Sequence, residues 1–140
     1  MTDAPGSTAG VHEMRLVVTV DDFEAALTYY RDVLGLSQDA AVSSPGGRVA
    51  ILEAGRATLE LADPAHAAYV DDIEVGWRVA GHVRVAFGVT DAAAATRAAV
   101  AAGARLIAAP VETPWRSRNA RLDGPGDLQL TLFEELVPRP

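Results

Sequence analysis

Apolar and polar residues alternate along two stretches of the chain that resemble each other, residues 13–20 and residues 83–89. Each stretch carries an arginine at the same position of the pattern, Arg15 in the first and Arg84 in the second. Alternation with a period of two is typical of a β-strand whose two faces differ. The matching patterns predict two related halves that both begin with such a strand.

A pattern with helical spacing follows each of these strands. Asp21 or Asp22 can cap the first helix, and Gly35 supplies the left-handed residue that ends it. The apolar residues of this helix recur every three or four positions and predict one buried stripe: Phe23, Ala26, Leu27, Tyr30 and Leu34. In the second half an alanine-rich helix is predicted over about residues 91–102, ended by Gly103.

Three short strand-like runs follow each helix and are separated by turn residues. The predicted strands are residues 36–42, 48–52 and 57–62 in the first half, and residues 105–109, 116–122 and 128–136 in the second. Pro110 is expected to break the chain after the first strand of the second set. The segment between the halves, residues 63–80, has weak periodicity and is predicted to be a connection.

These elements predict an α+β fold of two βαβββ modules, whose curved mixed sheets surround a cavity with the helices packed outside. The helix-facing residues of the repeated strands are Leu16, Val18 and Val20, and Val85, Phe87 and Val89. The opposite face carries Arg15, Val17 and Thr19, and Arg84, Ala86 and Gly88, and is expected to line the cavity. The predicted boundaries are a disordered N-terminus at 1–12 and a single domain at 13–136, with module one at 13–63, the connection at 64–80 and module two at 81–136.

Composition narrows the functions that such a cavity can serve. The chain has no cysteine, which excludes disulfides and thiolate chemistry. The formal net charge is −7 and the basic residues, all arginine, are scattered, so no nucleic-acid partner is expected. No apolar run approaches the ~20 residues that span a bilayer, and the first residues lack a signal-peptide pattern. We expect a soluble cytoplasmic protein without a membrane partner.

Several short segments together are similar to those of one known superfamily. They are residues 18–24 (VTVDDFE), 29–36 (YYRDVLGL), 87–91 (FGVTD) and 102–104 (AGA), with the turns at 113–115 and 124–127. Over about residues 13–136 the chain resembles the vicinal oxygen chelate superfamily of glyoxalases, bleomycin-resistance-type binding proteins and extradiol dioxygenases. The resemblance implies the two-module fold but does not choose among these functions.

Metal-dependent proteins of this kind place a His or Gln on the first strand of a module and a Glu on the last. The resemblance carries these positions onto Arg15, Glu60, Arg84 and, within about one residue, Thr131. Of the four, Glu60 alone can bind a metal well, because a guanidinium stays protonated and offers no lone pair. Catalytic zinc usually has three protein ligands. We therefore expect no metal and no other cofactor.

Two hypotheses account for a carboxylate between two guanidinium groups at these positions. In the first, Arg15 and Arg84 pair with Glu60, and the cluster replaces the metal as a structural cross-link between the halves. In the second, the surplus positive charge orients an acidic or carbonyl-bearing ligand. Both hypotheses predict that loss of Glu60 leaves buried guanidinium groups uncompensated.

The two tryptophans differ in their expected roles. Trp115 precedes a strand of the second module and is expected to line the pocket wall, where a flat ligand could stack on its ring. For Trp77 the simpler interpretation is favoured, which is packing in the core or at an interface. The predicted ligand-binding residues are therefore Arg15, Glu60, Arg84, Trp115 and Thr131.

The histidines were natural candidates for a metal ligand or a general base. His12 and His66 are expected to be exposed. His82 shares the strand parity of Arg84, so His82 and Glu60 with an acidic neighbour could form a displaced metal site.

Three functions are compatible with these patterns. The leading hypothesis is a metal-free small-molecule binding protein of the glyoxalase/bleomycin-resistance type, which sequesters an antibiotic or another planar metabolite and gives resistance to it. The alternative is a lyase-like or dioxygenase-like enzyme of the same superfamily that uses unorthodox metal ligands or Glu60 as a base. A third is an interaction domain whose pocket has closed. A homodimer is expected in each case.

Overall fold

The computed structural model describes residues 10–44, 46–55, 57–125 and 128–137. The first strand begins at Val11, so the ordered domain starts before the predicted boundary at residue 13. The disorder predicted for residues 1–9 falls outside the described residues. The described chain runs through the predicted βαβββ order twice, with one additional helix between the halves.

The elements of the first half are β1 (Val11–Thr19), α1 (Phe23–Leu27), a π-helical segment (Thr28–Val33), β2 (Ser37–Ser44), β3 (Gly47–Ala54) and β4 (Ala57–Ala62). The second half follows the helix α2 (Pro64–Glu74) and contains β5 (Val83–Val89), α3 (Ala92–Ala101), β6 (Arg105–Glu112), β7 (Ser117–Gly124) and β8 (Leu128–Glu135). The predicted α+β fold of two βαβββ modules is confirmed.

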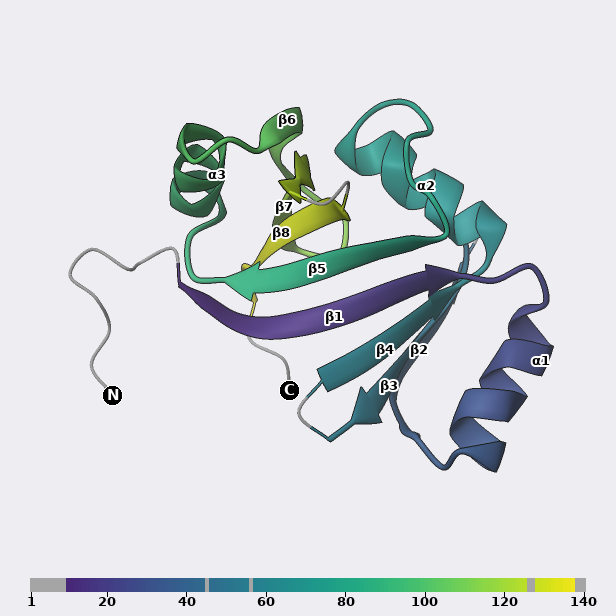
Figure 1. Ribbon diagram of the computed structural model, residues 1–140. Helices are drawn as coiled ribbons and strands as arrows, with labels where there is room; N and C mark the ends of the chain where they lie inside the picture. Colours follow the sequence, from purple (N-terminus) through teal and green to yellow (C-terminus); the bar gives the residue numbers. More distant parts are fainter. Residues whose placement is uncertain (1–9, 45, 56, 126–127, 138–140) are drawn as a thin grey trace.

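All eight strands form one curved mixed sheet in the order β2-β3-β4-β1-β5-β8-β7-β6. The two repeated strands, β1 and β5, are antiparallel neighbours at its centre, as Figure 1 shows. Each of them pairs in parallel with the last strand of its own module, β1 with β4 and β5 with β8. The halves are therefore joined by the strands on which the two arginines lie.

The helix α1 covers the outer face of the first module. Asp22 caps it by accepting a hydrogen bond from the backbone N–H of Ala25, and Phe23 and Leu27 are buried in the core cluster beneath it. Leu34 was predicted to belong to the buried stripe but is 54% exposed. The π-helical segment that precedes it is wider than an α-helical turn, so it rotates later residues off the stripe.

The helix α3 covers the second module and was predicted correctly. Asp91 accepts a hydrogen bond from the backbone N–H of Ala94 at its start. Its buried alanines pack on a cluster that includes Val89 and Leu132, with Phe87 beside it. On β1, by contrast, Leu16 is 38% exposed instead of being buried under a helix.

Pro110 does not end a strand, contrary to the prediction. It lies inside β6, which is at the edge of the sheet, and the register with β7 shifts between Ala108 and Val111. A proline is tolerated there because an edge strand needs only half of its backbone hydrogen bonds.

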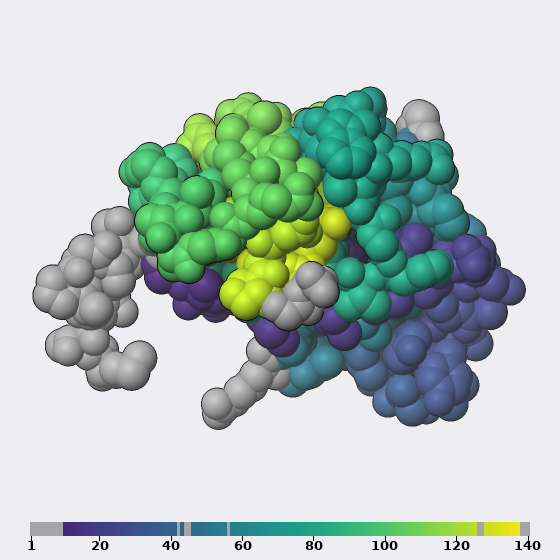
Figure 2. All heavy atoms as spheres, turned by 45° about the horizontal axis from the view of Figure 1, so that its top comes forward, coloured from purple at the N-terminus to yellow at the C-terminus, as the bar shows by residue number. Residues whose placement is uncertain are grey.

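The helix α2 was missed by the prediction of a plain connection. Asp63 caps it by accepting from the backbone N–H of His66, and Pro64 stands at its start, where a proline is favoured. In Figure 1 it lies above the sheet, apart from α1 and α3. Figure 2 shows its teal surface next to the green surface of β6 and β7. No helix among the described residues has the length and apolar character that a membrane crossing requires.

Candidate functional site

The inner face of the curved sheet and the helix α2 enclose a cavity of about 660 Å³. Strands of both modules contribute to its lining. The five residues predicted from the sequence, Arg15, Glu60, Arg84, Trp115 and Thr131, all line this cavity. Val17, Ala86 and Phe133 form a small buried apolar cluster on the same face.

The strand register fixes which positions of the two modules are equivalent. In the first module Glu60 on β4 pairs with Val17, and in the second module Thr131 on β8 pairs with Ala86. Val17 lies two residues after Arg15, and Ala86 lies two residues after Arg84. Thr131 is therefore the counterpart of Glu60, which removes the uncertainty of one residue in the last strand.

Arg15 donates hydrogen bonds to two carboxylates, and neither of them is Glu60. Its Nε donates to Glu13 at 2.7 Å, and its Nη2 donates to Glu135 at 2.9 Å. Its guanidinium also lies over the ring of Phe133, 4.5 Å from the centroid, which is a cation–π geometry. Arg15 is thus held in place by its own partners along the cavity wall.

Arg84 has a different environment. Its Nη1 donates to the hydroxyl of Thr131 at 2.7 Å. No carboxylate oxygen of the described residues comes within the 4.0 Å of an ion pair. Burial lowers the pKa of Arg84, with Glu74 the strongest charge acting in the opposite direction, but a guanidinium stays protonated at physiological pH. Arg84 therefore presents a charged donor group to the cavity.

Glu60 is a carboxyl group without a direct partner among the described residues. It is half-buried and forms neither a hydrogen bond nor an ion pair there. Burial raises the pKa of Glu60, and the nearby guanidinium groups of Arg84 and Arg15 counteract this only in part. The predicted pairing of Glu60 with both arginines is wrong, since Glu13 and Glu135 occupy Arg15, and so is the structural cross-link built on it.

A different cluster cross-links the inner face, and it is centred on Arg121 of β7. The side chain of Arg121 is fully buried and donates to Asp71 at 2.7 Å and to Glu74 at 2.8 Å, both on α2. Asn119 donates to Glu74 at 2.6 Å. Backbone N–H groups of residues 79 and 80 donate to Asp71 at 3.0 Å each. The cluster attaches α2 to the second module.

The spacing of these residues in the sequence is a signal for this cluster. Arg121 and Asn119 share one face of β7, because they are two residues apart. Asp71 and Glu74 are three residues apart, which places both on one side of a helix. Burial would raise the pKa of Asp71, but the backbone N–H groups of Ala80 and Val79 and the guanidinium of Arg121 outweigh burial and lower it.

His66 was expected to be exposed, but α2 turns it into the cavity wall. Its Nδ1 is buried without a hydrogen-bond partner in the described part of the chain. Burial lowers the pKa of His66, and the charge of Asp63 acts against this. The neutral imidazole is therefore favoured, with a ring nitrogen that can accept or donate one hydrogen bond.

Trp115 lies at the exposed end of the cavity, where 45% of it is accessible to solvent. Its ring centroid is 6.3 Å from that of Tyr69, which in turn is 6.2 Å from that of His66. The turn that carries Trp115 is fixed by the buried hydroxyl of Thr113, which binds the backbone of Ser117. The aromatic wall therefore combines α2 with the turn before β7.

Arg116, which follows Trp115, has φ 62°. A left-handed conformation is unfavourable for a residue with a side chain and persists only where surrounding contacts impose it. Trp77, by contrast, is 60% exposed and does not line the cavity, so the core position considered for it is wrong.

The residues present do not fit a metal ion. His82 is exposed, and its Nδ1 lies 3.3 Å from the backbone oxygen of Thr19, so the displaced site with Glu60 does not form. Within the described ranges, no three side chains of His, Asp or Glu gather into a metal-binding group. Arg15, Arg84 and Thr131 stand at the positions onto which the superfamily resemblance carries metal ligands, and none of them binds a metal well.

Comparison with known proteins agrees with this architecture. Residues 14–132 match the model of the Glyoxalase/Bleomycin resistance protein/Dioxygenase superfamily. CFP32 of Mycobacterium bovis, a protein named provisionally as a glyoxylase, is 32% identical over 127 residues, which are 86% of this chain and 41% of CFP32. The chain thus spans about two fifths of the length of the curated relatives that it matches.

Two solved structures illustrate the likeness in fold. Methylmalonyl-CoA epimerase from Mycobacterium tuberculosis has a TM-score of 0.67 at 21% identity, with 95% of this chain and 92% of that chain covered. A mutant of 4-hydroxymandelate synthase from Streptomyces coelicolor has a TM-score of 0.61 at 25% identity, with 93% of this chain and 39% of that chain covered. The two enzymes differ in reaction, so their common feature with this chain is the fold.

Proposed function

The chain belongs to the Glyoxalase/Bleomycin resistance protein/Dioxygenase superfamily, and from this premise we propose that its cavity binds a small organic molecule without a metal ion. The observation that carries the proposal is the cavity of about 660 Å³. Its size falls within the roughly 300–1,000 Å³ that small-molecule sites usually have. Its lining combines apolar walls with a few polar groups, which is also usual for such sites.

The lining divides into two parts that suit different parts of a ligand. Thr131 is 2% exposed and Arg84 donates to it, so a charged donor group lies deep in the cavity. Trp115 is 45% exposed, and the half-buried ring of Tyr69 lies beside it. A planar ligand with a polar group at one end fits this division, since aromatic side chains stack on flat apolar surfaces. Sequestration of a planar metabolite or antibiotic, and so resistance to it, is the role that we propose.

The test uses the fluorescence of Trp115 in a Trp77→Phe variant, where it is the single tryptophan. We expect anilinonaphthalene sulfonate, a planar aromatic probe, to bind saturably at one site per chain and to receive excitation energy from Trp115. A Trp115→Phe change in the same background should abolish the transfer and weaken the probe's binding. Absence of saturable binding by the probe, and by the neutral compound ethylnaphthalene in calorimetry, would contradict the proposal.

A second function is favoured by one observation, the unpartnered carboxyl group of Glu60 beside Arg84. A carboxylate with a raised pKa is suited to take a proton from carbon near neutral pH. A guanidinium is suited to stabilise the negative charge that then develops on an adjacent carbonyl oxygen. This arrangement would make the protein an enzyme of proton transfer next to a carbonyl group.

The two functions differ in what happens to a bound ketone. Acetonaphthone in deuterium oxide exchanges its methyl hydrogens only if a base removes them. Acceleration by the wild-type protein that is lost in Glu60→Gln would support the enzyme. Binding without acceleration would support sequestration alone.

A further inference from the structure

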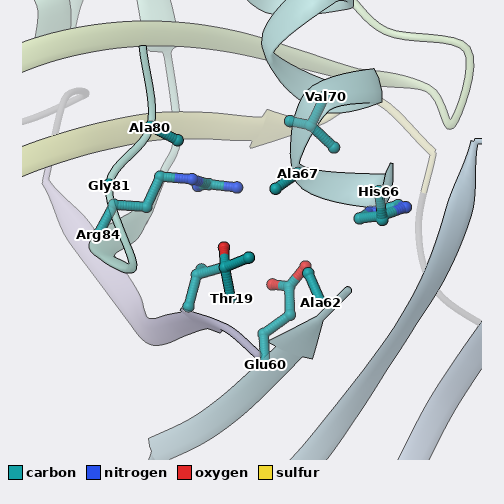
Figure 3. Close-up of a pocket in the computed structure, with 10 residues that line it drawn as sticks. Thr19, Glu60, Ala62, His66, Ala67, Val70, Ala80, Gly81 and Arg84 are labelled. Carbon is teal, nitrogen blue, oxygen red and sulfur yellow. The ribbon is translucent and has the colours of Figure 1, made fainter. Parts of the chain in front are cut away.

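A narrow recess opens beside the large cavity on the side of α2. Its volume is about 10 Å³, close to the smallest space that holds one water molecule. Figure 3 shows that Glu60, on β4, and Arg84, on β5, both point into it below α2. His66 and Thr19 contribute to its lining, whereas Arg15 and Thr131 do not. The recess is thus lined by two of the four positions onto which the superfamily resemblance carries metal ligands, and not by the other two.

Two polar groups around the recess, the Glu60 carboxyl and His66 Nδ1, have no hydrogen-bond partner in the described chain, whereas Arg84 also donates to Thr131. No Glu60 oxygen lies within 4.0 Å of the guanidinium nitrogens of Arg84. Both side chains line the recess (Figure 3), and Arg84 is the charge that lowers the pKa of Glu60 most strongly. A water can bridge two polar groups that lie beyond direct hydrogen-bond distance.

We propose that this recess is a subsite for one oxygen atom, occupied by a water in the free protein and by a carbonyl oxygen of the ligand in the complex. The proposal rests on the proposed binding function for its second half. A water has room here and has the two to four polar partners that a buried water requires. A ligand that displaces it must replace its hydrogen bonds, or it loses affinity.

The chemistry of the surrounding groups selects a carbonyl oxygen. Arg84 is always a donor, and Glu60 is a donor when it is protonated, the form that its burial favours. An oxygen that accepts two hydrogen bonds is the group that fits between two donors. A methyl group at the same place would leave the guanidinium N–H groups that face the recess without an acceptor, which is unfavourable.

The first half of the proposal is tested by a crystal structure of the free protein at a resolution that shows waters. We expect one peak in the recess, within hydrogen-bond distance of the Glu60 carboxyl group and of the Arg84 guanidinium. A recess that is closed by direct contact between these two groups, or that shows no density, would overturn it. This measurement needs no ligand, so it is independent of the proposed binding function.

The second half is tested by two probes of nearly equal shape, acetonaphthone and ethylnaphthalene, which compete with anilinonaphthalene sulfonate. We expect acetonaphthone to compete at a concentration at least about tenfold lower, since a hydrogen bond to a charged group is lost in the hydrocarbon. In Arg84→Met this preference should disappear while ethylnaphthalene binds as before. The control is Arg97→Met, a change of an exposed arginine on α3, which should keep the preference.

Three results would be decisive. Equal competition by the two probes in the wild-type protein, or an unchanged preference in Arg84→Met, would overturn the carbonyl subsite while the binding function stands. Failure of both probes and of the sulfonate to bind would overturn the binding function itself. A Thr19→Val variant keeps Arg84 in place and removes one polar group of the recess. It gives a second measure, a reduced preference, if Arg84→Met does not fold.

Discussion

Glu60 shows at the scale of one residue how burial and charge compete. Its carboxyl group lacks a hydrogen-bond partner in the described chain, and burial favours its protonated form more than Arg84 and Arg15 favour the charged form. The pKa of Glu60 in the folded protein is therefore above that in the unfolded chain. A folded state that holds a proton more tightly loses stability as the pH rises.

This sign gives a prediction for Glu60→Gln, which removes the titration and keeps the shape. Below the unfolded pKa of about 4.3 the contribution of Glu60 is fully present, and it is lost as the pH rises through the raised pKa of the folded state. We expect the free energy of unfolding of the wild type to fall relative to that of Glu60→Gln between pH 4.5 and pH 8. Urea unfolding of both proteins across this range measures it. A constant difference would contradict the raised pKa.

Strand parity and the resemblance to the superfamily together predicted the site residues, but they did not predict the partners of these residues. Parity placed Arg15 and Arg84 on the inner face because side chains alternate along a strand. Parity does not indicate which of several nearby carboxylates pairs with Arg15. Glu13 is two residues away on the same strand and so on the same face, and Glu135 has the parity of Thr131. Both carboxylates bind the guanidinium of Arg15, and Glu60 does not.

At the scale of an element, α2 determines one wall of the cavity. It could not be predicted from hydrophobic spacing because its buried face is partly ionic: Asp71 and Glu74 are each 3% exposed, beside Val70. The other helices were predicted because their buried residues are mainly apolar. A helix whose buried face is bound by a guanidinium lacks the apolar stripe by which a helix is recognised in a sequence.

The first prediction for α2 concerns Arg121→Met. It removes the guanidinium and leaves two carboxylates buried together, which typically costs about 3–5 kcal/mol. We expect urea unfolding to show this loss in the free energy of unfolding. Backbone amides of α2 should also exchange their hydrogens faster than those of α1. The matched control is Arg97→Met, because Arg97 is an exposed residue of α3. A stability within about 1 kcal/mol of this control would show that Arg121 does not hold the helix.

The second prediction for α2 uses two glycines with positive φ. Gly47 has φ 103° and Gly103 has φ 116°. A Cβ at Gly47 would meet the backbone of His66 and the capping carboxylate of Asp63, whereas Gly103 has open space around it. We expect Gly103→Ala to cost roughly 1 kcal/mol, from backbone strain alone. Gly47→Ala should cost at least twice as much and reduce the helical circular dichroism signal. Equal costs would contradict the close approach of β3 to the start of α2.

At the scale of the whole molecule, the two modules form one sheet through β1 and β5. Exposed apolar side chains lie on the face of these central strands that is opposite the cavity. They are Met14, Leu16 and Val83, with exposures of 44%, 38% and 47%. Burial of such a strip between two copies is one way to form the homodimer that we predict.

The homodimer is measured by sedimentation equilibrium. We expect twice the chain mass of 14.7 kDa for the wild type. Leu16→Glu should shift the equilibrium toward the monomer, because a charge would be buried in the interface. Thr90→Glu, at an exposed position outside this strip, is the control. A wild type that sediments as a monomer at all concentrations would contradict the prediction.

We propose that the cavity binds its ligand without a metal, because Arg15, Arg84 and Thr131 stand at the positions onto which the superfamily resemblance carries metal ligands. The most direct test is the titration of the Trp77→Phe protein with anilinonaphthalene sulfonate after exhaustive chelation, and again after incubation with zinc, iron, nickel or manganese. We predict saturable binding with the same dissociation constant in every sample. Binding that disappears on chelation and returns with a stoichiometric metal would contradict the claim.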